Sequence, residues 1–532
     1  MAQVSVIGAG AAGLATAALL ARDGHSVDVF EKNAEVGGRI GRIVRDGFRF
    51  DTGPSWYLMP EVYDHFFALM GTSAAVELDL VPLDPAYTVF TDPEASTAPS
   101  VTAEAAPVSV PRGRDRVVAV FEGRESGAGR RLQAHLRSAA HAKAMAERLF
   151  LYNPFTSPLS VLDRALLPSL PSLTRLLTES LSRRAERTVA DPRLRQILQY
   201  PAVFLGTDPR RAPAIYHLMS ALDLDEGVDY PMGGFRTVVN ALTRLAERAG
   251  ARIHTSAEVM AIETEATGRR RPRVTGVSWT DARSGARRTG ADIVVSAADL
   301  HHTQTRLLPP ALRGGSEGRW SRMVSGPGAV LVLLGVTGDL PQLPHHSLFF
   351  TPDWTENFDA IFGPRPRVPH PASLYVCRPS ATDPTVAPPG CENLFVLVPV
   401  PADAGLGGGG PEGSGDPLIE RAADRAIAQI AEWADIPDLA ERIVVRHTIG
   451  PTDFARDYNS WLGGMLGPAH TLRQSAMFRT QNVSRTVDGL YFAGATTAPG
   501  VGVPMCLISA EVVLKHSRGD SSPGPLPVGD GV

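Results

Sequence analysis

The alternation of apolar and polar positions changes its period twice within the first 31 residues. The apolar run at positions 4–7 predicts a short buried strand. A helical pattern then runs from about Ala11 to Arg22, and Gly24 ends it. A second apolar run at positions 27–30 predicts another strand, which ends at Glu31. The chain therefore begins with a strand, a tight turn, a helix and a second strand.

The turn between the first strand and the helix carries glycines at G-x-G-x-x-G spacing. Gly8 permits the tight turn, Gly10 lets the backbone approach a pyrophosphate, and Gly13 lets the helix pack on the strand. The helix directs its free N–H groups and positive dipole end at the same pyrophosphate. An acidic side chain at Glu31 can accept both ribose hydroxyls of an adenosine. The expected contacts here are Gly8, Gly10, Ala11, Ala12, Gly13 and Glu31.

This unit predicts a dinucleotide site, and both FAD and NAD fit it. A glycine-rich turn in an ordinary α/β unit is the alternative, but it does not explain Glu31. After Glu31, Gly37 and Gly38 allow the backbone to lie against a ligand, and Arg39 offers donors to a phosphate. The alternative for Arg39 is a turn with a surface arginine. A strand near 48–50 runs into a turn that can return to the cofactor. Lys32, Gly53, Pro54 and Ser55 are further expected contacts.

The middle of the chain is less regular. Residues 91–116 predict an exposed loop rich in Pro, Ala, Ser and Thr. From about 130 to 195 the pattern is helical, with leucines on one broad side and arginines beside them. These helices either turn their apolar face to a core or dip into one membrane leaflet with arginines at the headgroups. The leucines are Leu162, Leu166, Leu167, Leu170, Leu173, Leu176, Leu177 and Leu181.

The second half contains further strands and a final helix. Apolar runs predict strands at 293–300, 329–336, 394–400 and 490–492, and the glycine-rich segment 405–417 predicts a flexible loop. The glycines after 490–492 again allow close approach to a ligand, and the helix that follows can direct its N-terminus at a flavin or phosphate oxygen. The tail from Ser517 is expected to be disordered. The expected contacts here are Gly494, Ala495, Gly502, Val503 and Pro504.

Composition narrows the class of protein. The chain has 532 residues, too many for one core, and its formal net charge of −4 gives no argument for nucleic acid. It has no apolar run long enough to cross a bilayer and no signal peptide pattern. The three cysteines, Cys377, Cys391 and Cys506, are scattered. Their spacing predicts a reducing cytoplasm, no disulfide framework and no metal.

Four segments at the start resemble the signature of the flavin amine oxidase and carotenoid desaturase superfamily. They are V-x-V-I-G-A-G-A-A-G-L, V-F-E-K, V-G-G-R and F-D-T-G-P-S. The segment Y-P-M-G-G and the C-terminal G-x-x-x-x-P-G-x-G-V-P are similar to those of bacterial phytoene desaturases. The double-glycine motif of this family implies FAD rather than NAD. The resemblance also implies that Val259 and Ala297 lie at the cofactor.

The implied fold is α/β, with a discontinuous Rossmann-type FAD-binding domain, a mixed α+β substrate domain and a helical membrane-associating region. The FAD-binding domain is expected at 1–92, 228–300 and 446–532, the last including the tail. The helical region is expected at 93–227 and the sheet of the substrate domain at 301–445. The implied activity is a phytoene desaturase that extends conjugation in a C40 isoprenoid hydrocarbon towards lycopene.

The resemblance implies further partners and residues. Asp191 and Arg195 match an acidic-then-arginine pair suspected of catalysis in the bacterial enzymes, although helix capping explains Asp191 equally well. Oxygen or a quinone would take the electrons, and the protein would lie peripherally on the inner face of the cell membrane. A carotene cis-trans isomerase, a flavin amine oxidase and a non-enzymatic membrane-docking flavoprotein are alternatives. An amine oxidase would favour an aromatic cage where this chain has Thr496 and Thr497.

Overall fold

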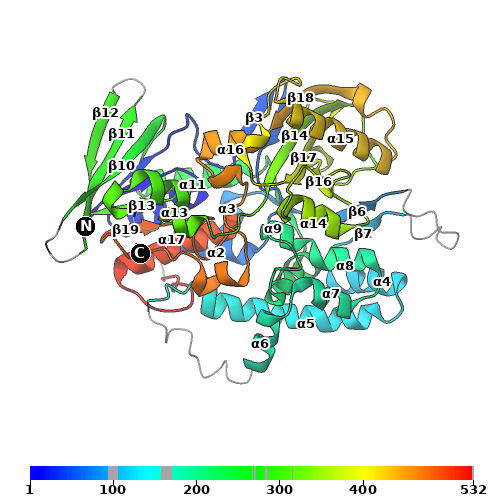
Figure 1. Cartoon of the computed structure of the whole chain (residues 1–532), viewed down its shortest axis with the longest axis horizontal. Coiled ribbons are helices and arrows are strands. Elements are labelled where there is room, and N and C mark those ends of the chain that lie inside the picture. Colours follow the sequence, from blue (N-terminus) through cyan, green and yellow to red (C-terminus); the bar gives the residue numbers. More distant parts are fainter. Residues whose placement is uncertain are drawn as a thin grey trace.

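The β-α-β unit at the start of the chain forms the centre of a parallel sheet (Figure 1). The computed structural model describes residues 1–93, 106–156, 170–266, 268, 271–281, 285–313 and 316–529. In it, α1 spans Ala11–Arg22, as the pattern predicts, between β1 (Gln3–Ile7) and β2 (Ser26–Phe30). The five strands lie in the order β19-β13-β1-β2-β9. The other three strands are β9 (Arg252–His254), β13 (Ile293–Ser296) and β19 (Leu490–Phe492).

Helix α1 lies inside the protein. Residues Ala11–Ala21 are all buried, because α11 (Arg236–Arg248) and α17 (Val503–Arg518) pack against α1. This burial explains why the helix is apolar on every side rather than along one stripe. Helix α2 (Pro60–Leu69) packs on α17, and α3 (Ala74–Glu77) follows it. The end of the chain is thereby fixed beside its beginning.

A second sheet of seven strands lies beside the first (Figure 1). Its neighbours pair antiparallel, except for the parallel pair β6 and β15. The runs predicted at 329–336 and 394–400 form β14 and β17, the most extensively paired strands of this sheet. Helix α15 (Pro417–Trp433) covers one face. In spatial order the strands are β18 (Ile443–Ile449), β14 (Gly328–Thr337), β17 (Cys391–Val400), β16 (Leu374–Cys377), β15 (His346–Phe350), β6 (Tyr87–Thr91) and β7 (Val108–Val110).

Smaller elements complete the two halves. Strands β10 (Ala257–Glu265), β11 (Arg273–Asp281) and β12 (Gly285–Gly290) form an antiparallel sheet at the upper left of Figure 1. Two ribbons pair β3 (Arg42–Arg45) with β4 (Phe48–Asp51), and β5 (Leu80–Pro82) with β8 (Asp229–Pro231). The remaining short helices are α10 (Met219–Ala221), α12 (Leu300–His302), α13 (Ser316–Trp320), α14 (Trp354–Phe362) and α16 (Pro451–Tyr458).

Most helices from the middle of the chain lie in the lower part of Figure 1. Within the described residues, Leu176 and Leu181 are buried, while Leu173 and Leu177 line a cavity. Leu162, Leu166 and Leu167 lie outside the described residues. Among the described helices, none combines the length and the apolar character that a membrane span requires. The helices are α4 (Arg114–Arg124), α5 (Ala128–Ala146), α6 (Leu170–Thr178), α7 (Leu181–Thr188), α8 (Pro192–Gln199) and α9 (Pro201–Phe204).

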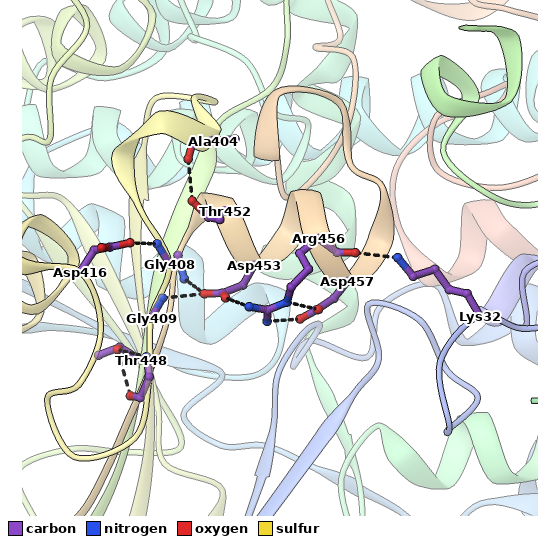
Figure 2. Close-up of polar contacts among 12 residues, drawn as sticks. Lys32, Ala404, Gly408, Gly409, Asp416, Thr448, Thr452, Asp453, Arg456 and Asp457 are labelled. Carbon is purple, nitrogen blue, oxygen red and sulfur yellow. Dashed lines mark hydrogen bonds and ion pairs between the residues drawn. The ribbon is translucent and has the colours of Figure 1, made fainter. Parts of the chain in front are cut away.

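Polar contacts hold the glycine-rich segment 405–417, which was expected to be a flexible loop. Figure 2 shows the N–H of Gly409 donating to Oδ2 of Asp453 at 2.6 Å and that of Gly408 donating to Asp416 at 2.7 Å. Asp453 also accepts from the backbone N–H of Gly450 and so fixes the start of α16. The acidic side chains thus take up backbone donors that a loop without regular structure leaves free.

The prediction of a disordered tail is wrong for the part that the structure describes. Leu526 is buried, and its N–H donates to Oε1 of Glu511 at 2.6 Å. The ammonium group of Lys515 is buried and donates to the carbonyl oxygen of Ser522 at 2.7 Å. The polar composition of the tail did not reveal these partners, because both belong to α17.

Candidate functional site

One cavity of about 680 Å³ extends from the carboxyl ends of β1 and β2 to the seven-stranded sheet. Every expected cofactor contact except Gly13 lines this cavity. A Cβ atom on Gly13 would lie 1.9 Å from the carbonyl oxygen of Gly8, so Gly13 serves the packing of α1 on β1, as its position predicts. The lining contacts are Gly8, Gly10, Ala11, Ala12, Glu31, Lys32, Gly37, Gly38, Arg39, Gly53, Pro54, Ser55, Val259, Ala297, Gly494, Ala495, Gly502, Val503 and Pro504.

The two glycine motifs near the N-terminus pack backbone against backbone. Gly8 has a φ of +94° and donates its N–H to the carbonyl oxygen of Phe30 at 2.8 Å. The N–H of Gly37 donates to the carbonyl oxygen of Ala9, also at 2.8 Å. A Cβ atom on Gly38 would approach Cα of Gly10 to 3.2 Å. Side chains on these residues would fill the space in which a pyrophosphate can meet the start of α1.

Glu31 is held in place at the end of β2. It is buried, and its two carboxylate oxygens accept from the N–H groups of Ala9 at 2.8 Å and Asn33 at 2.9 Å. A carboxylate has about four acceptor positions, so each oxygen keeps capacity for a ribose hydroxyl. The geometry therefore fits the ribose-binding role that the sequence predicts.

Arg39 lies at the same cavity with part of its donor capacity unused. Its Nη2 donates to Oγ of Ser460 at 2.8 Å and lies 3.9 Å from Oδ2 of Asp299. Its Nε is buried and has no hydrogen-bond partner among the described residues. Burial raises the pKa of Asp299, although the guanidinium opposes this shift. A partly exposed guanidinium with a free, buried Nε donor fits a phosphate.

Sequence reasoning missed both partners of Arg39. Asp299 lies two residues after the expected contact Ala297, so its position could have identified it. Ser460 lies in a segment without a recognisable motif, and only the fold brings it to the cavity. Lys32 reaches the same segment, since its Nζ donates to the carbonyl oxygen of Arg456 at 2.6 Å (Figure 2).

The expected cofactor contacts that line the cavity form what we call the cofactor cradle. The C-terminal motif, residues 494–504, completes this cradle from the side opposite the N-terminal glycines. A Cβ atom on Gly494 would lie 3.3 Å from Cβ of Ala12, at the start of α1. Gly502 has a φ of +121° and directly precedes α17. The side chains of Thr496 and Thr497 bond to backbone groups of Leu300 and Gly494. This segment therefore contributes backbone to the cavity rather than an aromatic cage.

Arg479 is a third residue that sequence reasoning missed. Its buried guanidinium donates to four backbone carbonyl groups, and burial lowers its pKa to about 10. Two of these carbonyls, at Ala495 and Thr497, belong to the cofactor segment. Arg479 therefore positions this segment. Its acceptors are Pro468, Gln474, Ala495 and Thr497.

The structure does not bring Asp191 and Arg195 to the cavity, since neither is among the described residues that line it. Oδ1 of Asp191 accepts from the N–H groups of Arg193 at 2.8 Å and Leu194 at 3.0 Å, which makes it the N-cap of α8. Nε of Arg195 donates to the carbonyl oxygen of Val189 at 2.9 Å. Oδ2 of Asp191 also lies 3.6 Å from Nε of Arg124. Capping and this ion pair are the contacts of the Asp191 carboxylate, and neither supports the expected catalytic pair.

Beyond the cofactor cradle the cavity becomes a chamber lined mainly by apolar side chains. They come from the seven-stranded sheet, from α14, from the helical region and from residues 465–478. Ser55 and Tyr375 are polar exceptions, and their hydroxyl oxygens lie 2.6 Å apart. The main apolar lining residues are Leu173, Leu177, Phe204, Leu205, Leu331, Leu348, Phe350, Phe358, Ile361, Phe395, Leu397, Met465, Leu466, Leu472, Met477 and Phe478.

The sequence matches the family of flavin containing amine oxidoreductases over residues 11–512. The chain belongs to this family. It is 38% identical to a carotenoid 3,4-desaturase from Haloarcula japonica over 508 residues, which cover 96% of each chain. It is 32% identical to a phytoene desaturase from Fusarium fujikuroi, covering 97% of this chain and 89% of the relative. These similarities confirm the resemblance to the carotenoid desaturases within the flavin amine oxidoreductases.

The fold of this flavin amine oxidoreductase has solved counterparts. An oxidoreductase from Methanosarcina mazei aligns with a TM-score of 0.59 over 96% of this chain and all of that chain, at 17% identity. That similarity shows the α/β fold. Together with the free Nε of Arg39 and the glycine-lined cradle, the family confirms FAD as the cofactor. The protein is thus a flavin-dependent oxidoreductase.

Proposed function

We propose that this oxidoreductase desaturates a long isoprenoid hydrocarbon of the carotenoid type. The observation that carries the proposal is the continuity of the cofactor cradle with the apolar chamber in one cavity. A substrate in the chamber can lie against the flavin without crossing water. The carotenoid and phytoene desaturases among the relatives support the same class of substrate.

The side chains of the chamber suit a substrate that has almost no hydrogen-bonding group. Such a molecule is bound by removal of its apolar surface from water, at about 25 cal/mol per Å². The leucine and phenylalanine side chains provide this surface and exclude water from the reacting carbons. FAD, when bound, accepts the hydrogen pair that leaves the substrate as electrons and protons. The protein therefore positions the substrate and keeps water away from the reacting carbons.

Two reactions of this class differ in their substrate. In the first, which the family resemblance implies, phytoene is converted towards lycopene. The carotenoid 3,4-desaturase at 38% identity favours a second candidate, in which the substrate is already a conjugated carotenoid. Oxygen or a quinone as final electron acceptor stays a prediction for either reaction.

Membrane association on the inner face of the cell membrane is part of the proposal. Leu472, Met477 and Phe478 line the cavity and are also exposed, and we call these three residues the apolar rim. Leu173 and Leu177 of α6 line the same cavity, and Arg175 between them is exposed. An exposed apolar rim, together with a basic side chain on another helix that lines the same cavity, suits a membrane surface from which a hydrocarbon can enter the chamber.

The decisive experiment offers several substrates to the purified flavin-loaded protein in vesicles. Under anaerobic conditions we expect phytoene or a conjugated carotenoid to bleach the flavin and to yield a product with a longer polyene. Reduction by phytoene alone, or by the conjugated carotenoid alone, selects between the two reactions. Bleaching by amines but by neither hydrocarbon would refute the proposal. Rearrangement of a poly-cis carotene without net flavin reduction would identify an isomerase instead.

A further inference from the structure

Three side chains that commonly bind metals meet behind the wall of the chamber. They are His345, His346 and Cys377, and one potential ligand atom from each lies within 4.8 Å of the other two. His346 and Cys377 are paired opposite each other on the antiparallel strands β15 and β16. All three side chains are buried. Thirty residues separate the two histidines from the cysteine in the sequence, so no short sequence motif indicates the cluster.

The two imidazoles are held as metal-binding histidines usually are. Nδ1 of His345 lies 2.7 Å from Oγ1 of Thr382, and Nδ1 of His346 lies 2.8 Å from the hydroxyl oxygen of Tyr375. Thr382 and Tyr375 can each accept from the imidazole, and in the tautomer in which Nδ1 donates, the lone pair of Nε2 is left for a cation. In both rings Nε2 is buried and has no hydrogen-bond partner among the described residues.

Aromatic contacts fix the orientation of both rings. Trp56 stacks on His346 with ring centres 4.5 Å apart and an interplanar angle of 9°. Tyr230 packs against His345 at 4.6 Å. A site whose ligands are already oriented loses little conformational entropy when an ion binds.

We propose that His345, His346 and Cys377 bind a cation of the soft or borderline class, Cu⁺ or Zn²⁺. Imidazole nitrogen together with thiolate sulfur is the donor set that these d¹⁰ ions prefer, whereas Mg²⁺ and Ca²⁺ require oxygen. The bound ion ties β15 to β16 directly behind Trp56 and Tyr375, which line the chamber. The ion therefore stiffens the part of the wall on which the hydrocarbon would lie. Metal binding is independent of the proposed reaction.

The charges of the cluster favour the monovalent ion. Two neutral imidazoles and one thiolate together supply a single negative charge, and all three side chains are buried. A cation that binds to the sulfur displaces the thiol proton to solvent. The complex of Cu⁺ with one thiolate has no net charge, whereas the complex of Zn²⁺ with one thiolate has a net charge of +1. Burying that charge away from water costs free energy, so the site favours Cu⁺.

The test uses the full-length protein with its flavin bound. Elemental analysis after purification, and after separate incubation with Zn²⁺ or with Cu⁺ under anaerobic conditions, gives the number of ions per chain and identifies the preferred ion. We expect about one tightly held ion. Co²⁺ serves as a spectroscopic probe, because a charge-transfer band in the near ultraviolet reports a bond to sulfur.

Cys377→Ser is expected to abolish both the bound ion and the charge-transfer band. Cys391→Ser is the matched control, since Cys391 is a partly exposed cysteine of the same sheet and lies outside the cluster. An ion that persists in Cys377→Ser, or wild-type protein that binds none, would overturn the proposal. If Cys377→Ser does not fold, X-ray absorption of metal-loaded wild-type protein decides, because a first shell without sulfur also contradicts it.

Discussion

Replacing the apolar rim by serine should release the protein from membranes. Leu472 and Met477 are each 42% exposed, and Phe478 is 62% exposed. Full burial of such a side chain stabilises by about 1.5–3 kcal/mol, so the exposed part of Phe478 accounts for about 1–2 kcal/mol and each of the others for about 1 kcal/mol. The triple variant should lose about 2–4 kcal/mol of membrane affinity, or about 30- to 1,000-fold in the partition coefficient.

The assay is sedimentation of the flavin-loaded protein with vesicles over a range of lipid concentrations. Phe478→Ser alone should weaken partition by about 5- to 30-fold. Met260→Ser is the matched control, because Met260 is 53% exposed but belongs to β10 and does not line the cavity. The flavin spectrum and the melting temperature show whether each variant is folded.

Two results would refute this reasoning. If the triple variant sediments with vesicles as wild type does, the rim does not contact the membrane. If Met260→Ser weakens partition as much as Phe478→Ser does, the effect comes from general surface hydrophobicity rather than from the mouth of the cavity.

Three further predictions concern the cradle, a buried acid and a helix cap. Gly13→Ala should abolish retention of FAD through purification, because the new Cβ atom would collide with the backbone of Gly8. Gly123→Ala in α4 is the control, because the space around Gly123 is open and this variant should retain FAD. Equal flavin content in the two purified variants would contradict the prediction. Burial raises the pKa of Asp51 from 3.8 to about 6, so the folded state loses stability as the pH rises through this interval, by about 3 kcal/mol in total. Asp51→Asn should therefore gain melting temperature relative to wild type at pH 8 but not at pH 4, and a gain independent of pH would contradict the cause. Asp191→Ala should cost about 1 kcal/mol of stability and leave kcat unchanged, while Asp191→Asn restores stability; loss of turnover in both variants would restore the catalytic hypothesis.

The cofactor cradle could be predicted from the sequence because each of its parts is a local backbone requirement. Gly8 adopts a positive φ, and the surroundings of Gly13 leave no room for a Cβ atom. Both positions therefore require glycine, and the two glycines appear in the sequence at a fixed spacing. Glu31 ends the second strand and therefore lies at the carboxyl edge of the sheet, where the turn also lies. The bounds of α1 follow from the same pattern.

Other parts of the site have no recognisable pattern in the sequence. In the sequence, Arg479 cannot be distinguished from an ordinary surface arginine. In the structure its guanidinium is buried and donates to four backbone carbonyl groups. In the sequence, Asp191 fits both a helix cap and a catalytic acid, and its place at the start of α8, outside the cavity lining, distinguishes the two. Propensity describes a residue and its neighbours, whereas these roles depend on distant backbone.

The sequence by itself determined the flavin-binding unit, the apolar strands and the family, because glycine spacing and periodicity constrain the chain locally. The shape of the chamber depends on the tertiary structure alone, since its ordinary leucines and phenylalanines come from four separate parts of the fold, namely the seven-stranded sheet, α14, the helical region and residues 465–478. The same holds for the cluster at His346 and Cys377. Scattered cysteines predict no metal, but the antiparallel register of β15 and β16 places that thiol opposite an imidazole, and register is a property of paired strands rather than of either strand alone.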